Sequence, residues 1–208
     1  MIYSDNTATD ILFHEIGGED AIKSFMKKHD IKGIDVSRSI LEVIAHTDGV
    51  EITDEKFSSV SDYYDRLSIV GIDNEEKARK SFFSSRKDAT TAKAFLNFLL
   101  KLHNGELLST SSNEYLSKIM LKNAHGKKRL KGYLPTHSFE HKTGSFSMLS
   151  NDAGILTLPG NKGHVILVGS VMERKPYRMP DSKQFIKKRD DLLAILAKTV
   201  YDFFLFST

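Results

Sequence analysis

Hydrophobic residues recur with a helical period through most of the first half of the chain. Between residues 58 and 87 this order is lost, and polar residues alternate with scattered aromatic ones. That region is expected to be a long excursion with one or two helices. Elsewhere the period and the capping residues predict five helices. They are Thr9–Ile16, Glu19–His29, Ser39–His46, one from a Thr90-Thr91 cap to Asn104-Gly105, and one from a Ser111 or Ser112 cap to the region between Asn123 and Gly126.

The pattern changes in the last third of the chain, where three short apolar segments follow one another. We expect strands at His137–Lys142, Gly154–Leu158 and His164–Met172. Both faces of the third strand are largely apolar, which predicts burial on both sides. From Pro180-Asp181-Ser182 to about Phe206, an apolar stripe at helical spacing predicts a long helix that covers one face of the sheet.

This order of elements is helices, then an antiparallel meander, then a covering helix. It predicts an α+β fold. We expect two interdependent parts: a helical lobe over residues 1–135, which includes the long excursion, and a meander with its C-terminal helix over residues 136–208.

Composition excludes several classes of protein. With 40% hydrophobic and 27% charged residues, the chain is typical of a globular protein. A formal charge of +3 is too small to indicate a nucleic-acid partner. Lys198 and Asp202 interrupt the longest apolar run, so we expect no membrane span. The chain has no cysteine, and its histidines lack H-x-H or H-E-x-x-H spacing, so we expect neither a metal nor a cofactor.

Two short motifs carry the candidate chemistry. Ser4-Asp5-Asn6 opens the chain, and Lys142-Thr143-Gly144 lies on the first expected strand. S-D-N and K-T-G belong, with S-x-x-K, to the signature of serine enzymes that react with penicillins. Five segments extend the match in the same order: S-D-N-T-A at residues 4–8 with I-G-G at 16–18, G-E-L-L at 105–108, R-L-K-G-Y-L-P at 129–135, H-K-T-G-S at 141–145 and N-D-A-G-I at 151–155.

On these segments the chain resembles the C-terminal two-thirds of class A β-lactamases and penicillin-binding serine hydrolases. The resemblance implies a serine β-lactamase/DD-peptidase-like fold whose first strands and nucleophile helix are missing from this chain. It implies a β-lactam or a peptidoglycan-like peptide as the small-molecule partner. It also implies a periplasmic or secreted location, although no signal peptide precedes Ser4.

The resemblance assigns catalytic roles to three residues. Ser4 would pass a proton toward the β-lactam nitrogen as the ring opens. Lys142 would strengthen the field for acylation and attract the substrate carboxylate. The backbone N–H of Ser145 would supply half of the oxyanion hole.

Four more residues are expected to bind the substrate. Asn6 would hold its side-chain amide, Thr143 would bind its carboxylate together with the Ser145 hydroxyl, and Gly144 would admit its backbone close to the strand. Arg129 takes the place of a carboxylate-binding arginine, because residues 154–158 contain none. The alternative is that Arg129 is a surface residue of a basic loop.

Two departures from the family pattern bear on activity. The S-x-x-K nucleophile lies well before S-D-N in the family, whereas this chain begins three residues before S-D-N. We therefore expect the nucleophile upstream of Met1 in a full-length protein. The family's E-x-x-L-N sequence, which supplies the deacylating glutamate, has no match. Glu42 is the nearest carboxylate, and a surface acid of a helix is the alternative interpretation.

Three functional hypotheses follow. The full-length protein is a serine β-lactamase that works through an acyl-serine intermediate, or a penicillin-binding, DD-peptidase-like or esterase-like protein that deacylates slowly. The third is a non-catalytic, degenerate fragment. Without the family's first strands, the 164–172 strand would present a bare apolar edge. We therefore expect a partner chain or an upstream segment to cover that edge.

Overall fold

The computed structural model describes residues 1–51, 60–135, 138–146, 148–172 and 183–207. Helices fill the first part of the chain, and a three-stranded sheet with one long helix follows. The elements are α1 Asn6–Glu15, α2 Gly18–Lys28, α3 Ile40–Asp48, α4 Val60–Ser68, α5 Ile72–Ser84, α6 Ala92–His103, α7 Thr110–Leu121, β1 Phe139–Phe146, β2 Leu149–Thr157, β3 His164–Met172 and α8 Lys183–Phe206.

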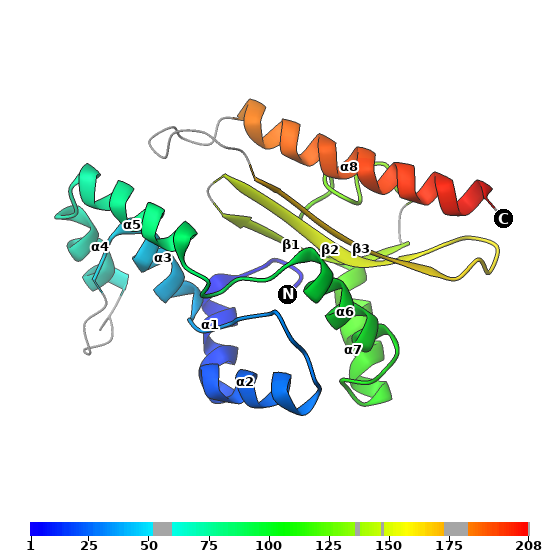
Figure 1. Cartoon of the computed structure of the whole chain (residues 1–208), viewed down its shortest axis with the longest axis horizontal. Helices are drawn as coiled ribbons and strands as arrows, with labels where there is room; N and C mark the ends of the chain where they lie inside the picture. The colour runs from blue at the N-terminus through cyan, green and yellow to red at the C-terminus, as the bar shows by residue number, and fades with distance from the viewer. Residues whose placement is uncertain (52–59, 136–137, 147, 173–182, 208) are drawn as a thin grey trace.

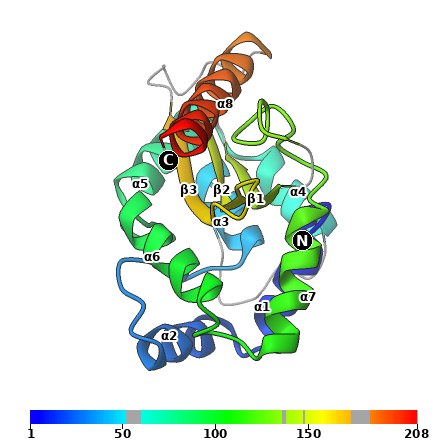
Figure 2. The same cartoon turned by 90° about the vertical axis from the view of Figure 1, so that its right-hand side faces the viewer.

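The sheet is an antiparallel meander in the order β1-β2-β3, packed between helices (Figures 1 and 2). Helix α8 lies along one face, while α6 and α7 contact the other. Residues of β1, β2 and β3 form a core with α8 that centres on Phe139, Leu156 and Leu193. Ala153 faces the opposite way and packs with Leu99 of α6. The α+β prediction is confirmed.

The strands are longer than the sequence pattern predicts. β3 has the predicted bounds, but β1 continues to Phe146 and β2 begins at Leu149. The polar K-T-G-S and S-N-D segments hide these extensions from a search for apolar runs, yet they pair with each other residue by residue. The predicted starts of the first strand, His137, and of the last helix, 180–182, lie outside the described residues.

Helix starts follow the predicted capping chemistry with one correction. Thr91 caps α6 with its side-chain oxygen, as expected, and Ser39, predicted as the first residue of a helix, caps α3 in the same way. Helix α7 is capped by Ser109 rather than by Ser111 or Ser112. The Ser109 hydroxyl accepts from the Ser112 backbone N–H, so the helix begins two to three residues earlier than predicted.

The predicted excursion contains two helices, α4 and α5, which stand beside α3 away from the sheet (Figure 1). We call α3, α4 and α5 the α3–α5 excursion. It has a small core of its own around Ala45, Val50 and Tyr63. Its base is narrow, because Ile34 pairs with Thr90 across an isolated bridge.

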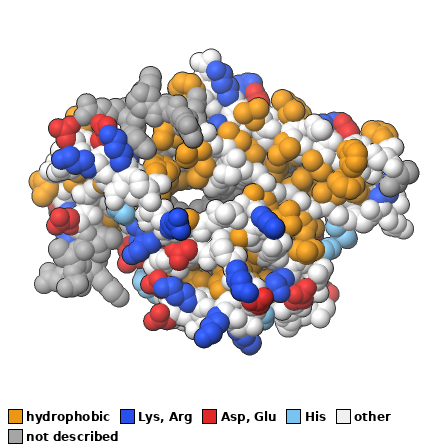
Figure 3. Space-filling model, in the orientation of Figure 1, with side chains coloured by type: hydrophobic (Ala, Val, Ile, Leu, Met, Phe, Trp, Pro, Cys, Tyr) orange, Lys and Arg blue, Asp and Glu red, His pale blue; other side chains and the backbone are white. Residues whose placement is uncertain are grey.

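One side of the sheet carries exposed apolar surface. Among the described residues, β3 pairs with β2 alone. Figure 3 shows hydrophobic side chains over α8 and around a hollow between the α3–α5 excursion and the sheet. A cavity of about 490 Å³ there is lined by Phe82, Phe83, Phe95 and Met172, among others. No described helix is long and apolar enough to cross a membrane.

Candidate active site

Ser4 occupies a tight, left-handed turn just before α1. Its φ is 51°, a conformation that non-glycine residues rarely adopt and that neighbouring contacts must hold in place. The Ala124 N–H donates to the Ile2 carbonyl at 3.1 Å, and His125 Nε2 lies 2.8 Å from the Tyr3 carbonyl. Together these contacts fix the backbone that presents the Ser4 hydroxyl.

Asp5 and Asn6 continue the motif into α1. The Asp5 carboxylate accepts from the Ala8 N–H at 2.7 Å and is the N-cap. Helix α1 therefore begins at Asn6, one turn earlier than the apolar pattern predicts. Asn6 is the first helical residue, and its exposed side chain lines the same cleft as Ser4.

Lys142 joins the two motifs. Its Nζ lies 2.6 Å from Ser4 Oγ and 2.6 Å from the Thr143 carbonyl oxygen. Burial lowers the pKa of Lys142, the Asp152 carboxylate opposes that change, and Arg129 adds to it. An ammonium that donates to a serine hydroxyl can polarise that hydroxyl and attract an anion.

Five of the sequence-predicted residues line one cleft of about 520 Å³: Ser4, Asn6, Arg129, Thr143 and Ser145. Lys142 and Gly144 line the adjoining cavity of about 490 Å³, which shares Thr143 with this cleft. Thr143 and Ser145 reach it from β1, and Arg129 reaches it from the segment after α7. Basic residues rim the cleft, since Lys127 and Lys128 also line it. Gly144 leaves room above the strand, because an added Cβ would meet only Asn151, at 3.6 Å or more. The cleft suits a small anion with polar groups.

Arg129 is buried, with 8% of its surface exposed, and most of its N–H groups donate to acceptors of the protein itself. Its Nε donates to Asp190 at 3.0 Å, and its Nη1 donates to the carbonyls of Gly144 and Asn151. Nη2 donates to Ser145 Oγ at 2.6 Å. A guanidinium has five N–H groups, so one hydrogen on Nη2 remains for a ligand. The structure therefore favours a single bond to a substrate carboxylate over a two-pronged pair.

Glu42 has a local structural role. Its Oε2 accepts from the Ser39 backbone N–H at 2.6 Å, while the Ser39 hydroxyl accepts from the Glu42 N–H. This reciprocal pair is a capping box at the start of α3. Glu42 also lines a cavity of about 360 Å³ inside the excursion, whose lining includes neither Ser4 nor Lys142.

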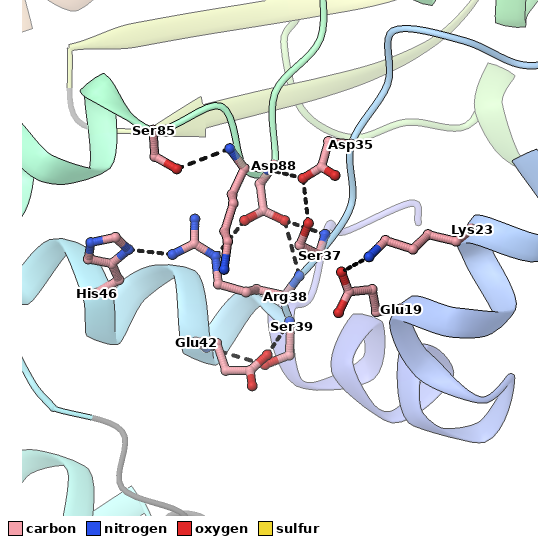
Figure 4. Close-up of polar contacts among 11 residues, drawn as sticks. Glu19, Lys23, Asp35, Ser37, Arg38, Ser39, Glu42, His46, Ser85 and Asp88 are labelled. Carbon is pink, nitrogen blue, oxygen red and sulfur yellow. Dashed lines mark hydrogen bonds and ion pairs between the residues drawn. The ribbon is translucent and has the colours of Figure 1, made fainter.

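A polar cluster beside Glu42 closes the base of the excursion (Figure 4). Asp88 accepts from the backbone N–H groups of Ser37 and Arg38, and its other oxygen lies 2.6 Å from Arg38 Nε. Asp35 in turn accepts from the Asp88 N–H at 2.7 Å. His46 Nδ1 contacts Arg38 Nη1. We call Asp35, Ser37, Arg38, His46 and Asp88 the base cluster.

Four residues that shape the site were not predicted from the sequence. Asp190 pairs with Arg129, Gly126 packs on Thr143, and His141 and Asp152 form a buried pair below the K-T-G strand. His141 and Asp152 lie within the H-K-T-G-S and N-D-A-G-I segments that carry the resemblance, although neither was assigned a role. Asp190 and Gly126 lie outside all the matched segments, and nothing local marks them.

Comparison with known proteins shows which fold this arrangement belongs to. The meander, its K-T-G strand and the helix over it match the α+β fold of class A β-lactamases. A TLA-1 extended-spectrum β-lactamase structure is 25% identical, with a TM-score of 0.66 over 97% of this chain and 60% of that one. A β-lactamase structure from Chitinophaga pinensis has a TM-score of 0.67 at 25% identity, over 96% of this chain and 60% of that one.

The sequence profile described as the β-lactamase enzyme family matches residues 1–204. The chain belongs to this family. It is 27% identical to β-lactamase VEB-1 of Pseudomonas aeruginosa, over 97% of this chain and 56% of that protein. It is 25% identical to the extended-spectrum β-lactamase PER-1 of the same organism, over 97% of this chain and 53% of that protein. The chain thus spans about half the length of these relatives.

Proposed function

We propose that this chain forms the substrate-binding and proton-relay part of a serine β-lactamase, which opens the β-lactam amide through an acyl-serine intermediate. The observation that carries the proposal is the 2.6 Å contact between Lys142 Nζ and Ser4 Oγ at a basic cleft. Family membership supplies the reaction class, and this contact joins the two motifs that the reaction requires.

Each of the seven residues at or beside the cleft that the sequence predicted has a task in this reaction. Ser4 passes a proton to the leaving nitrogen of the opened ring, and Lys142 holds the Ser4 hydroxyl and attracts the substrate carboxylate. Thr143 and Ser145 bind that carboxylate, with Arg129 contributing its remaining Nη2 hydrogen. The Ser145 N–H contributes to the oxyanion hole, Asn6 binds the side-chain amide of the substrate, and Gly144 leaves space for it.

The attacking serine comes from a segment that covers the β3 edge, either upstream in a full-length protein or on a partner chain. Two features support such a cover: the outer edge of β3 pairs with no described strand, and a hollow lined by aromatic residues lies beside the sheet. An unpaired apolar edge is a feature that proteins avoid. By kinship with its relatives, the protein works in the periplasm or outside the cell.

A second candidate function is penicillin binding or acyl transfer with slow deacylation, on a peptidoglycan-like peptide. The position of Glu42 favours it. That carboxylate caps α3 and lines a cavity separate from the Ser4 cleft, so it is poorly placed to activate water. A long-lived acyl-enzyme results when no base drives hydrolysis.

The test combines measurements of turnover, mass and binding. The chain is mixed with a family segment that contains S-x-x-K and incubated with a chromogenic β-lactam while hydrolysis and intact mass are recorded, and the affinity of the chain alone is measured by calorimetry. Rapid turnover supports the β-lactamase, whereas a stoichiometric, lasting mass increase supports the slow acyl transfer. Binding that Lys142→Met weakens at least about tenfold, without turnover or mass change, supports the substrate-binding part alone.

The control is Lys198→Met, which removes an exposed lysine of α8 that pairs with Asp202. It is expected to leave affinity unchanged. If the wild-type chain neither binds nor reacts, and still does neither after mixing with a family segment that contains S-x-x-K, the chain is a degenerate homologue and the proposal is wrong.

A further inference from the structure

His141 and Asp152 form a fully buried polar pair beneath the K-T-G strand. Both side chains are 0% exposed, and His141 Nδ1 lies 2.8 Å from Asp152 Oδ1. Asp152 is the cross-strand partner of Thr143, and His141 precedes Thr143 by two residues on the same face of β1. Burying two ionisable groups is costly unless they are paired, so the contact needs a reason.

The pair connects β1 and β2 to the segment that holds Ser4. The second Asp152 oxygen accepts from the Leu130 N–H at 3.2 Å, and Asn123 Nδ2 donates to the His141 carbonyl at 3.1 Å. Asn123 also accepts from the His125 N–H, and His125 contacts the Tyr3 carbonyl. A continuous series of hydrogen bonds thus runs from the buried pair to the residue before Ser4.

The His141–Asp152 pair also lies next to Lys142 in the sheet. Lys142 lies directly between His141 and Thr143, and its cross-strand partner Ala153 follows Asp152. The Asp152 carboxylate is the favourable charge for the Lys142 ammonium, since it raises the pKa that burial and Arg129 lower. Lys87 and Asp88 line the same hollow as Lys142, and Arg129 is paired with Asp190.

The hydrogen bonds define the charge state of the pair. Asp152 Oδ2 accepts from the Leu130 N–H, and Oδ1 lies 2.8 Å from His141 Nδ1, to which a carboxylate offers only acceptors. Burial raises the pKa of Asp152 above its ordinary value, and the His141 contact and the Arg129 charge offset part of that increase. Nδ1 of His141 therefore carries a hydrogen. Nε2 is buried and has no partner among the described residues.

We propose that His141 and Asp152 are positioning residues. Their hydrogen bonds fix the strand that carries Lys142 relative to the segment that carries Ser4, and Asp152 places a negative charge beside the Lys142 ammonium. The role of Lys142 rests on the proposed function, but its position and charge do not. The pair thereby keeps the Ser4–Lys142 contact intact while the cleft is empty.

The test reads Lys142 directly, by NMR titration of its side chain in the purified chain without substrate. Asp152→Asn keeps the acceptor oxygen but removes the charge. It is expected to weaken the proton affinity of Lys142 by at least about threefold. Asp202→Asn, at an exposed carboxylate of α8 paired with Lys198, is the matched control and is expected to cause no shift. A folded Asp152→Asn chain with unchanged Lys142 titration would overturn the proposal.

A second measurement does not depend on a variant that folds. In the wild-type chain at neutral pH, nitrogen NMR of His141 is expected to show a hydrogen on Nδ1, and a ring protonated only on Nε2 contradicts the pair. Failure here is distinct from failure of the proposed function. A shifted Lys142 titration in a chain that binds no β-lactam upholds this inference and rejects that function.

Discussion

At the scale of single residues, the side chain of Arg129 joins three parts of the molecule. It bonds to Asp190 of α8, to backbone carbonyls of β1 and β2, and to the Ser145 hydroxyl at the cleft. Its sequence position predicted a residue that binds a ligand. The structure adds that most of its donors stabilise the wall of the cleft, so a substitution acts on folding as well as on binding.

Arg129→Lys is expected to lower the free energy of unfolding by about 3 kcal/mol, because one ammonium cannot replace four directed bonds and Asp190 loses its partner. Urea denaturation measures the change. Lys128→Ala, at the exposed neighbouring residue, is the control and is expected to stay within about 0.5 kcal/mol of the wild type. Equal effects of the two variants would show that the buried bonds contribute nothing.

Gly126 allows a second test of single-residue packing. Its φ is 70°, and an added Cβ would lie 2.3 Å from Thr143 Cγ2. Gly105 has a φ of 73° but nothing within 4 Å, so the two glycines share the backbone cost and differ in the contact. Gly126→Ala is expected to destabilise the chain by about 1–3 kcal/mol more than Gly105→Ala in the same denaturation assay. Equal losses would mean that Thr143 moves aside freely.

The sequence predicted Ser4, Lys142 and Thr143 as site residues because each lies in a short contiguous motif. The structure brings them together, and their catalytic roles stay predictions. Asp190 and Gly126 were not predictable in this way. Their contacts join residues far apart in the chain, and nothing local distinguishes Asp190 from the other acids of α8. His141 and Asp152 differ from these two residues, because both lie inside segments that carry the resemblance, although no role was predicted for either.

At the scale of elements, the α3–α5 excursion is a small helical unit attached by its base cluster. The sequence predicted one helix at α3 and one or two in the region of α4 and α5, where the structure has two. It did not predict the base, because Asp88 closes the base across some fifty residues. Figure 4 shows how Arg38 lies between the Asp88 carboxylate and the His46 ring. Phe82 of α5 also contacts Phe146 of β1, so the excursion touches the end of the K-T-G strand.

This geometry predicts a pH dependence of stability. Burial, and then Arg38, lower the pKa of His46 below its ordinary value of 6.5. The unfolded chain therefore binds this proton more tightly than the folded chain. The free energy of unfolding is expected to fall as the pH drops below 6.5, until the folded-state pKa is passed.

Urea denaturation over a pH series measures this fall, and His46→Gln is expected to reduce it. His14→Gln, at an exposed residue of α1, is the control and is expected to retain the wild-type slope. Hydrogen exchange in α3 locates the effect, because opening of the base cluster would expose that helix first. A His46→Gln slope equal to that of the control contradicts the prediction.

At the scale of the whole molecule, the described part of the sheet ends at β3, and apolar side chains of α8 are exposed. Leu192, Ile195 and Phe203 each have more than half of their surface exposed. Helix α8, which carries this apolar surface, contacts β3, the outermost strand of the described sheet. An uncovered edge with apolar surface beside it favours association with another chain.

The chain alone is therefore expected to associate as its concentration rises, with sedimentation velocity as the measurement. Ile195→Lys places a charge on the exposed side of α8 and is expected to weaken association at least about tenfold, because the charge must be desolvated in any interface there. Tyr115→Lys is the control, on exposed α7 at the opposite face of the sheet, and is expected to have no effect. A wild-type chain that stays monomeric at high concentration tolerates its bare edge, and the proposed cover over β3 would then lose its physical basis.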